Sequence, residues 1–415
     1  MAVTPTIQSD FSEVMKDFYS NVWTQLINPD TPLKGQFSRL ENAQFTGRKW
    51  IFGVKTAIGG GAANAGGNKS LPAAAIGTYD QGEATLVRTY TRMAIDLLLV
   101  EVTKKQAGSY RPALAEAMSD RLQAHDLEIN RQLFGNGDAQ LALLATDSGT
   151  SQVLEKDYGV ANGGLGTRHI YVGDVLQPYS QAFVARTKCT VTAVDHDTAT
   201  LTVTPDPVTT AGDFFCRATS DTDNYIAGEA QGLLASVKAS VTLHAIPATG
   251  PWKATVLSNS GTLRDISDSL VMTAIETVRA RSRTTPNLCV TTPGIVLKYS
   301  ELFLPLRRLD GQDVQLKGGY KPVAAIIHAG GSIPVITDND CPNTRLFLLN
   351  TGAFRMADMV GTDMMDMDGA TVSRVADKDA VEAFWRKYWA LCTVARNQNA
   401  LISDLNDIVG IGKAA

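Results

Sequence analysis

The amino-acid sequence predicts a mixed α+β fold, and two observations support this prediction. Apolar residues recur at helical spacing in residues 10–26, 112–134 and 262–281, so each segment would carry one apolar face. Between them, stretches rich in Thr and Val alternate apolar and polar residues with the period of two that is typical of strands. At about 150 residues per domain, the 415 residues correspond to somewhat fewer than three domains.

Composition excludes several classes of protein. With 38 Lys and Arg against 42 Asp and Glu, the net charge is −4, and charged residues make up only 19% of the chain. Proteins that hold nucleic acid by its phosphates need clustered basic residues, so this balance disfavours such binding. The most apolar stretch, Met93–Val102, contains Asp96 and is shorter than the roughly 18 residues that a spanning helix needs. We therefore expect no membrane association.

The N-terminus and the cysteines both indicate a protein made and kept in a reducing compartment. The first residues lack a basic region and an apolar run, and the first basic residue is Lys16, so no secretory signal is expected. The closest two of the five cysteines, Cys189 and Cys216, are 27 positions apart. This spacing is unlike that of cysteine metal sites, and reduced, mostly buried thiols are expected.

Residues 10–26 form the first predicted helix. Asp10 with Glu13 can cap its start, and Pro29 makes continuation unfavourable. Its apolar face includes Phe11, Phe18 and Trp23. Two interpretations stay open: the face packs in the core of its own subunit, or it docks on a neighbouring one.

Two predicted strands follow, over residues 48–55 and 84–90, and we expect them to pair with each other. The first strand contains Trp50. Between them lies a Gly-rich tip over residues 59–70, which begins Gly59-Gly60-Gly61 and ends in Lys69-Ser70. A connection of this length and composition is usually functional or disordered.

The tip also imitates a phosphate-binding loop, because Gly61 and Gly66 have the required separation and a Lys-Ser pair follows. The imitation is incomplete. In a true phosphate loop the Lys directly follows the second Gly, whereas here Gly67 and Asn68 intervene. Leu71-Pro72 also stands where a helix should begin. These differences disfavour nucleotide binding.

The strongest helix prediction covers residues 112–134, with Pro112 at its start and Gly135-Asn136-Gly137 as its stop. Next, residues 170–217 are predicted to form a small antiparallel β unit inserted between helical parts. Within it, residues 190–194 and 199–204 alternate at period two, and Asp195-His196-Asp197-Thr198 joins them as a hairpin turn.

The C-terminal half is predicted to alternate helices and strands. Its predicted elements are a helix over residues 262–281, a short helix over 293–303, strands over 323–328, 333–336 and 345–350, a strand or short helix over 381–393, and a closing segment over 400–402.

Catalytic and metal-binding motifs were sought without success. No Gly-x-Ser-x-Gly elbow occurs, and the five histidines form no metal-site pair. Two acidic segments, 195–197 and 363–369, resemble cation sites only partly; an exposed turn and adaptable packing are the simpler interpretations. Gly163-Gly164-Leu165-Gly166 lacks the third glycine of a dinucleotide motif. We therefore expect no enzyme activity, no cofactor and no resident metal.

The order of these parts resembles that of a known family. The resemblance rests on the end of the long helix over residues 127–138, the run over 292–299 and the run Arg396-Asn397-Gln398-Asn399 before the closing segment. In these features and in outline the chain is similar to the major capsid protein of tailed bacteriophages, which has the Hong Kong 97-like fold.

The resemblance implies a division of the chain into six parts. They are an N-terminal arm (1–44), an extended β-hairpin loop (45–100), a peripheral domain with the long spine helix (101–165), an inserted β-rich unit (166–260), an axial domain (261–345), and a return to the peripheral and axial core (346–415).

The resemblance also implies a structural function. The chain would self-assemble into pentamers and hexamers of an icosahedral shell around a double-stranded DNA genome, in a virion assembled in the host bacterial cytoplasm. A scaffolding protein, a portal and a decoration protein would be its partners. Phe11, Phe18, Trp23, Trp50, Gly59, Gly60, Gly61 and Lys69 are the candidate inter-subunit contacts. The alternatives are an encapsulin-like compartment and a nucleotide-binding enzyme that uses the loop over residues 59–70.

Overall fold

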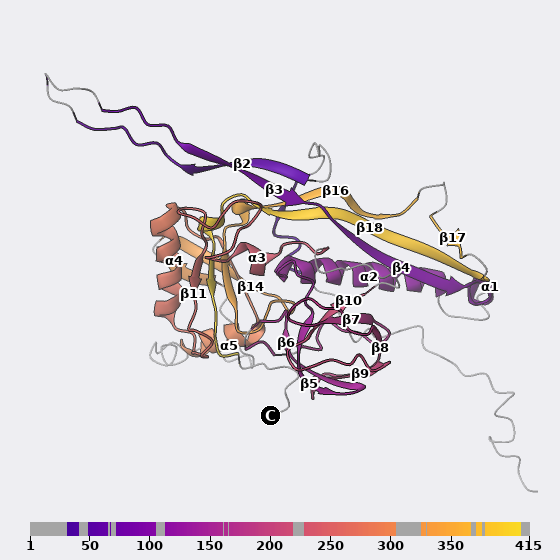
Figure 1. The fold of residues 1–415 in the computed structure, drawn as a ribbon. Helices are drawn as coiled ribbons and strands as arrows, with labels where there is room; N and C mark the ends of the chain where they lie inside the picture. The colour runs from indigo at the N-terminus through magenta and orange to yellow at the C-terminus, as the bar shows by residue number, and fades with distance from the viewer. Residues whose placement is uncertain are drawn as a thin grey trace, which may run out of the picture.

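A computed structural model of the chain describes residues 31–40, 49–64, 67, 72–104, 113–160, 162–164, 166–218, 228–303, 325–328, 330–366, 371–375 and 378–407. The long helix α2 lies between a long sheet on one side and a barrel on the other, and a mixed sheet with its helices lies beside one end of α2 (Figure 1). The predicted N-terminal helix over residues 10–26 falls outside the described residues.

Helix α2, Ala113–Phe134, confirms the predicted spine helix. Its C-terminal half is buried, with Ile129, Leu133 and Phe134 fully covered, whereas Leu122, which was expected on its apolar face, is 40% exposed. His125 is buried against the long sheet, where its Nδ1 lies 2.9 Å from Thr91 Oγ1. Because burial disfavours the charged ring, the pKa of His125 falls to about 4.

The long sheet answers the question that the sequence left open at residues 381–393. This segment is strand β18, Ala380–Thr393, and every second residue from Ala383 to Trp389 is buried. Beside it run β16, Phe354–Met364, with the parallel β1, Ser38–Leu40, at the edge. The short β17, Ser373–Arg374, and the long β4, Val87–Asp96, also pair with β18, and α1, Leu97–Lys104, follows β4.

The pairing of the first hairpin corrects one prediction. Strand β2, Lys49–Ala57, pairs with β3, Thr78–Thr85, and not with residues 84–90. After Leu86 alone the chain continues as β4, which pairs with β18. The expected loop over residues 45–100 therefore has two parts, because only β2 and β3 form the separate hairpin. No turn residue marks this change of partner, so the sequence pattern does not reveal it.

The inserted β unit is a closed barrel of six strands in the order β10-β5-β6-β9-β8-β7. These are β5 (Ala142–Ser148), β6 (Ser151–Asp157), β7 (Val175–Tyr179), β8 (Cys189–Asp195), β9 (Thr200–Thr204) and β10 (Phe214–Arg217). The predicted β8–β9 hairpin is confirmed, but the barrel begins at Ala142, so a boundary at residue 166 or 170 divides it. The register shifts between β5 and β6 break the simple alternation that would have indicated them.

The mixed sheet has the strand order β11-β19-β15-β12-β14-β13. Its strands are β11 (Thr255–Leu257), β12 (Leu288–Thr291), β13 (Ala325–His328), β14 (Gly331–Thr337), β15 (Leu346–Leu349) and β19 (Ala400–Ile402). The strands predicted here are confirmed, as is α5, Pro293–Glu301. The sheet also draws in β11, β15 and β19, which lie outside residues 261–345.

Helix α4, Asp268–Ser282, begins six residues later than predicted. Ser267 caps it by accepting a hydrogen bond from the Leu270 N–H. The preceding residues are held in an extended connection, where the Arg264 N–H donates to the Asp404 carbonyl. Three short helices complete the described structure: α3 (Leu233–Ser236), η3 (Thr351–Ala353) and η4 (Arg396–Gln398).

Candidate interaction surfaces

The β2–β3 hairpin projects away from the body of the molecule (Figure 1). Its base is anchored: the rings of Trp50 and Phe52 stack with centroids 4.9 Å apart, and Phe52 meets the edge of the His244 ring at 5.7 Å. Gly82 lies opposite Phe52, and a Cβ at this position would come within 2.5 Å of the ring. Only glycine therefore allows the ring to lie across the ladder at this point.

Beyond this base, the hairpin exposes apolar side chains. Ile58 is 86% exposed, Ile76 90% and Tyr79 68%. The two arms stay close beyond the ladder, because Cβ atoms at Gly59 and Gly61 would lie 2.6 Å and 2.7 Å from the carbonyl oxygens of Ala75 and Ala73. The result is a narrow ribbon whose apolar residues are not covered by the described part of its own chain. Exposed apolar surface of this kind marks an interaction site.

The same geometry bears on the phosphate-loop alternative. The faces of Gly59 and Gly61 are occupied by the opposite arm rather than open to an anion. Residues 72–77 form no helix and lead into β3, whereas a phosphate loop needs a helix N-terminus at this position. Lys69 itself lies outside the described residues.

The structure separates the other candidate contact residues. Phe11, Phe18 and Trp23 lie outside the described residues. Trp50 is half-buried in the hairpin base, so it anchors the hairpin rather than standing free. Gly60 faces open space on the projecting ribbon.

A second surface was not predicted. On the face of β4 and β18 opposite to the one that covers α2, three cross-strand pairs each join one arginine and one aromatic residue: Arg88–Tyr388, Tyr90–Arg386 and Arg92–Phe384. The Arg88 guanidinium lies 5.8 Å from the Tyr388 ring centre and that of Arg92 lies 5.7 Å from the Phe384 ring centre. We call this the Arg–aromatic ladder. The period-two alternation of Arg88, Tyr90 and Arg92 in the sequence is the signal that could have found it.

A cleft of about 1590 Å³ runs beside β4. It is lined by β4, by the outer part of α2 and by the segment around Tyr171 in the barrel. Strand β4 pairs with β18 along one edge, and no described strand pairs with its other edge. An unpaired strand edge is able to accept a further strand, so cleft and edge together form a candidate docking surface.

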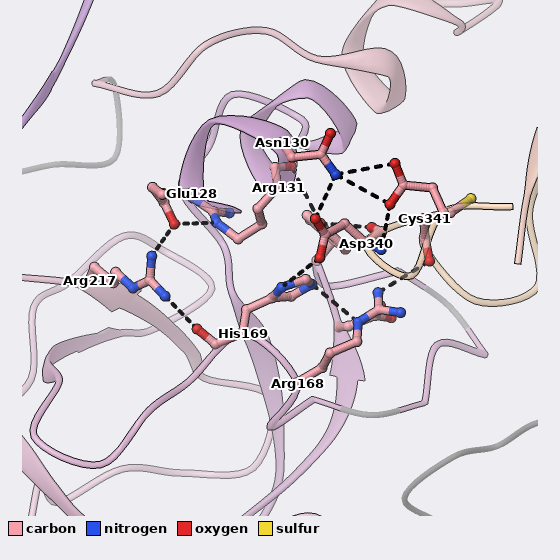
Figure 2. Close-up of polar contacts among 11 residues, drawn as sticks. Glu128, Asn130, Arg131, Arg168, His169, Arg217, Asp340 and Cys341 are labelled. Atoms are coloured by element: carbon pink, nitrogen blue, oxygen red, sulfur yellow. Dashed lines mark hydrogen bonds and ion pairs between the residues drawn. The ribbon is translucent and has the colours of Figure 1, made fainter. Parts of the chain in front are cut away.

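A buried polar cluster joins α2, the barrel and the turn between β14 and β15 (Figure 2). On the α2 side, Arg131 bonds Glu128 at 2.6 Å and also pairs with Glu229. Arg217 of the barrel pairs with the same Glu128 and donates to the His169 carbonyl at 2.6 Å. Burial alone would raise the pKa of Glu128, but Arg131 and Arg217 lower it to about 2.

The other half of the cluster holds the turn. Asn130 Nδ2 donates to both carboxylate oxygens of Asp338 at 3.2 Å and to Asp340 at 2.6 Å. Tyr158 donates to the Asp340 carbonyl at 3.0 Å. Burial, together with the neighbouring Asp340, raises the pKa of Asp338 to about 6. Since its groups face one another rather than the cleft, the cluster fixes the relative positions of three units.

The remaining predictions about chemistry concern cysteines, metals and membranes. All five cysteines are free and buried, as predicted, and burial raises the pKa of Cys189 to about 12. Asp195 accepts the Thr198 hydroxyl hydrogen bond at 2.8 Å, which is the arrangement of a turn. The described residues contain no group of three His, Cys, Asp or Glu placed to hold a metal ion. None of the described helices is long and apolar enough to cross a membrane.

Known proteins were compared by sequence and by structure. No family model and no curated protein matches the sequence. A chain of the cyanophage A-1(L) capsid asymmetric unit matches the structure with TM-score 0.59 and 13% identity, over 96% of this chain and 99% of that one. A chain of Mycobacterium phage Bobi matches at 0.52 and 9%, over 97% and 99%. The capsid of an empty GTA particle matches at 0.51 and 9%, over 98% and 100%.

The chain has the Hong Kong 97-like capsid fold. The capsid fold accounts for nearly the whole chain, because these matches cover it almost from end to end. At 9–13% identity the likeness lies in the arrangement of the backbone and not in shared residues.

Proposed function

We propose that this chain is the major capsid protein of a tailed phage. Copies of it would self-assemble into pentamers and hexamers of an icosahedral shell around double-stranded DNA. The observation that carries this proposal is the projecting hairpin, which exposes Ile58, Ile76 and Tyr79 in a chain with a capsid fold. Its role is therefore structural rather than enzymatic.

The hairpin supports the proposal on physical grounds. An isolated two-stranded hairpin is only marginally stable in water. The ribbon beyond the β2–β3 ladder gains nothing from its own subunit, whereas lying over a neighbouring subunit would cover its apolar residues. Many such modest contacts, repeated around a shell, add up through multivalency.

The fold suggests how the parts would be used. In this proposal α2 and the long sheet form the peripheral domain, and the mixed sheet forms most of the axial domain at the capsomer centre. The Arg–aromatic ladder and the cleft beside β4 are contact surfaces for neighbouring copies. The barrel stands apart from both and would face outward or touch the next capsomer.

Charge is compatible with a container for DNA. A net charge of −4 per chain gives a mildly acidic shell that would not adhere tightly to packed DNA. In this proposal the shell assembles in the host bacterial cytoplasm, with a scaffolding protein and a portal, and with a decoration protein as a further partner.

Size measurement tests the proposal directly. The purified chain is passed over a sizing column with light scattering, and the earliest fraction is imaged by negative stain. Megadalton shells or ring-shaped capsomers are expected; a monodisperse monomer or dimer, even with scaffolding protein added, would contradict the proposal. DNA inside shells from the native source would support a phage capsid, whereas a protein cargo would indicate an encapsulin-like compartment.

A further inference from the structure

Three side chains meet just beyond the end of α2. Lys238 Nζ donates a hydrogen bond to Asn136 Oδ1. The amide nitrogen of the same Asn136 donates to Asp138 Oδ2 at 2.7 Å. An amine, a carboxamide and a carboxylate thus stand in a row, and the amine comes from a segment 102 positions further along the chain.

The surrounding backbone holds these groups in place. Helix α3 packs beside the end of α2 (Figure 1). The approach is so close that a Cβ at Gly232 would lie 2.4 Å from the carbonyl oxygens of Gln132 and Leu133. Lys238 follows α3 directly, and its carbonyl accepts from the Ala254 N–H. The amine and the carboxamide are therefore positioned by backbone contacts and not only by their own flexible side chains.

We propose that Lys238 and Asn136 form an isopeptide bond within one chain, with Asp138 as the proton-transfer group. The attacked atom, Asn136 Cγ, is one bond away from the oxygen that already contacts Lys238 Nζ. Reacting atoms held this close need little further ordering, which removes much of the entropic barrier.

The reaction is a balanced amide exchange. Lys238 attacks as the neutral amine, so a bond forms between Nζ and Asn136 Cγ, and the bond from Cγ to Nδ2 breaks. Asp138 accepts the proton that Nζ loses and passes it to Nδ2, which leaves as ammonia. No oxidant or reductant takes part. Burial lowers the pKa of Lys238, Asp138 raises it and Arg396 lowers it, so the net shift favours the reactive neutral form.

The bond would have a distinct structural effect. Every strand of the barrel, from Ala142 to Arg217, lies between Asn136 and Lys238 in the sequence. The bond would close a covalent ring whose contents are the whole barrel, and it would tie the base of the barrel to the end of the spine helix. It needs no second subunit.

Mass spectrometry of the purified full-length chain tests this proposal. After incubation at mildly alkaline pH, the intact mass should be lower by one molecule of ammonia. Proteolysis should then release a branched peptide that joins the segments containing Asn136 and Lys238. Absence of that branched peptide from the wild-type chain would overturn the proposal, whatever the variants do.

Variants distinguish the bond from other losses of ammonia. Asn136 precedes Gly137, and cyclisation of the Asn136 side chain on the backbone would release the same mass. Lys238→Arg should abolish the mass loss; if the variant still loses ammonia, cyclisation is the cause and the proposal is wrong. Asp138→Asn should slow the loss at least tenfold. Lys298→Arg is the matched control, because Lys298 pairs with the carboxylate of Asp265 and should leave the reaction unchanged.

Discussion

The hairpin and the barrel are both β structures that extend from the body of the molecule, but they satisfy their strands in opposite ways. The barrel closes on itself, so each of its strands is paired on both sides, and Leu154, Leu201 and Phe215 are buried inside it. The hairpin has two strands, two open edges and exposed isoleucines. The comparison teaches that one unit is complete within a single chain, whereas the other gains its stability from a second copy.

The largest expected effect lies in the barrel. Phe215→Ala should lower the free energy of unfolding of the subunit by about 3–5 kcal/mol, because it empties the centre of a closed core. Denaturant unfolding of the unassembled subunit measures this loss. A loss below about 1 kcal/mol would show that the barrel is not the self-sufficient unit described above.

A pair of glycines tests how the hairpin is anchored. Gly82→Ala should cost about 1–3 kcal/mol, because the new methyl group collides with the Phe52 ring. Gly53→Ala is the matched control on the opposite strand, where nothing lies within 4 Å. Thermal unfolding of both variants gives the comparison, and equal effects would argue against a specific contact of Phe52 with Gly82.

The buried cluster, which joins the barrel to the body, predicts two opposite pH dependences. The folded-state pKa of Asp338 is raised to about 6, so its contribution to stability is complete at low pH and is lost as the pH rises from about 4 through 6. Glu128, with its pKa lowered to about 2, stabilises the fold above its unfolded pKa and loses this effect as the pH falls toward 2.

Stability should therefore be highest near pH 4–5 as far as these two groups decide it. Asp338→Asn should flatten the decline between pH 4 and 6 by about 1–3 kcal/mol, as measured by denaturant unfolding at a series of pH values. An unchanged profile in this variant would assign the decline to other groups.

The smallest effect on stability is expected at the far part of the hairpin. Ile76→Ser should change the free energy of unfolding by less than about 0.5 kcal/mol, because the side chain is 90% exposed. The same variant should nevertheless impair shell formation, measured by light scattering and negative stain. Leu263→Ser, at a residue 45% exposed elsewhere on the surface, serves as the control. Equal loss of shells in both variants would contradict a specific role for the hairpin.

Local pattern was sufficient for some elements and insufficient for others. The spine helix and the β8–β9 hairpin were predictable because their capping, turn and periodicity signals lie within a few residues of one another. The change of partner from β3 to β4 was not, because it depends on pairing with β18, almost 300 positions away. No turn residue at Leu86 announces it.

The interaction surfaces follow the same rule. The exposed Gly-rich ribbon was visible in the composition of residues 59–70. The buried cluster was not, because Asn130 and Asp338 are 208 positions apart and each looks like an ordinary polar residue in its own segment. Burial and long-range contact, which give these residues their meaning, are properties of the fold and not of the local sequence.

The closure of the barrel has a practical consequence for engineering. Its first and last strands, β5 and β10, are hydrogen-bonded neighbours, so the chain enters and leaves the barrel on one side. A unit with adjacent ends can be exchanged for a foreign domain whose own ends lie close together, without moving the spine helix. The barrel is therefore a natural mounting point, at which each copy of an assembled particle could display an antigen or an enzyme.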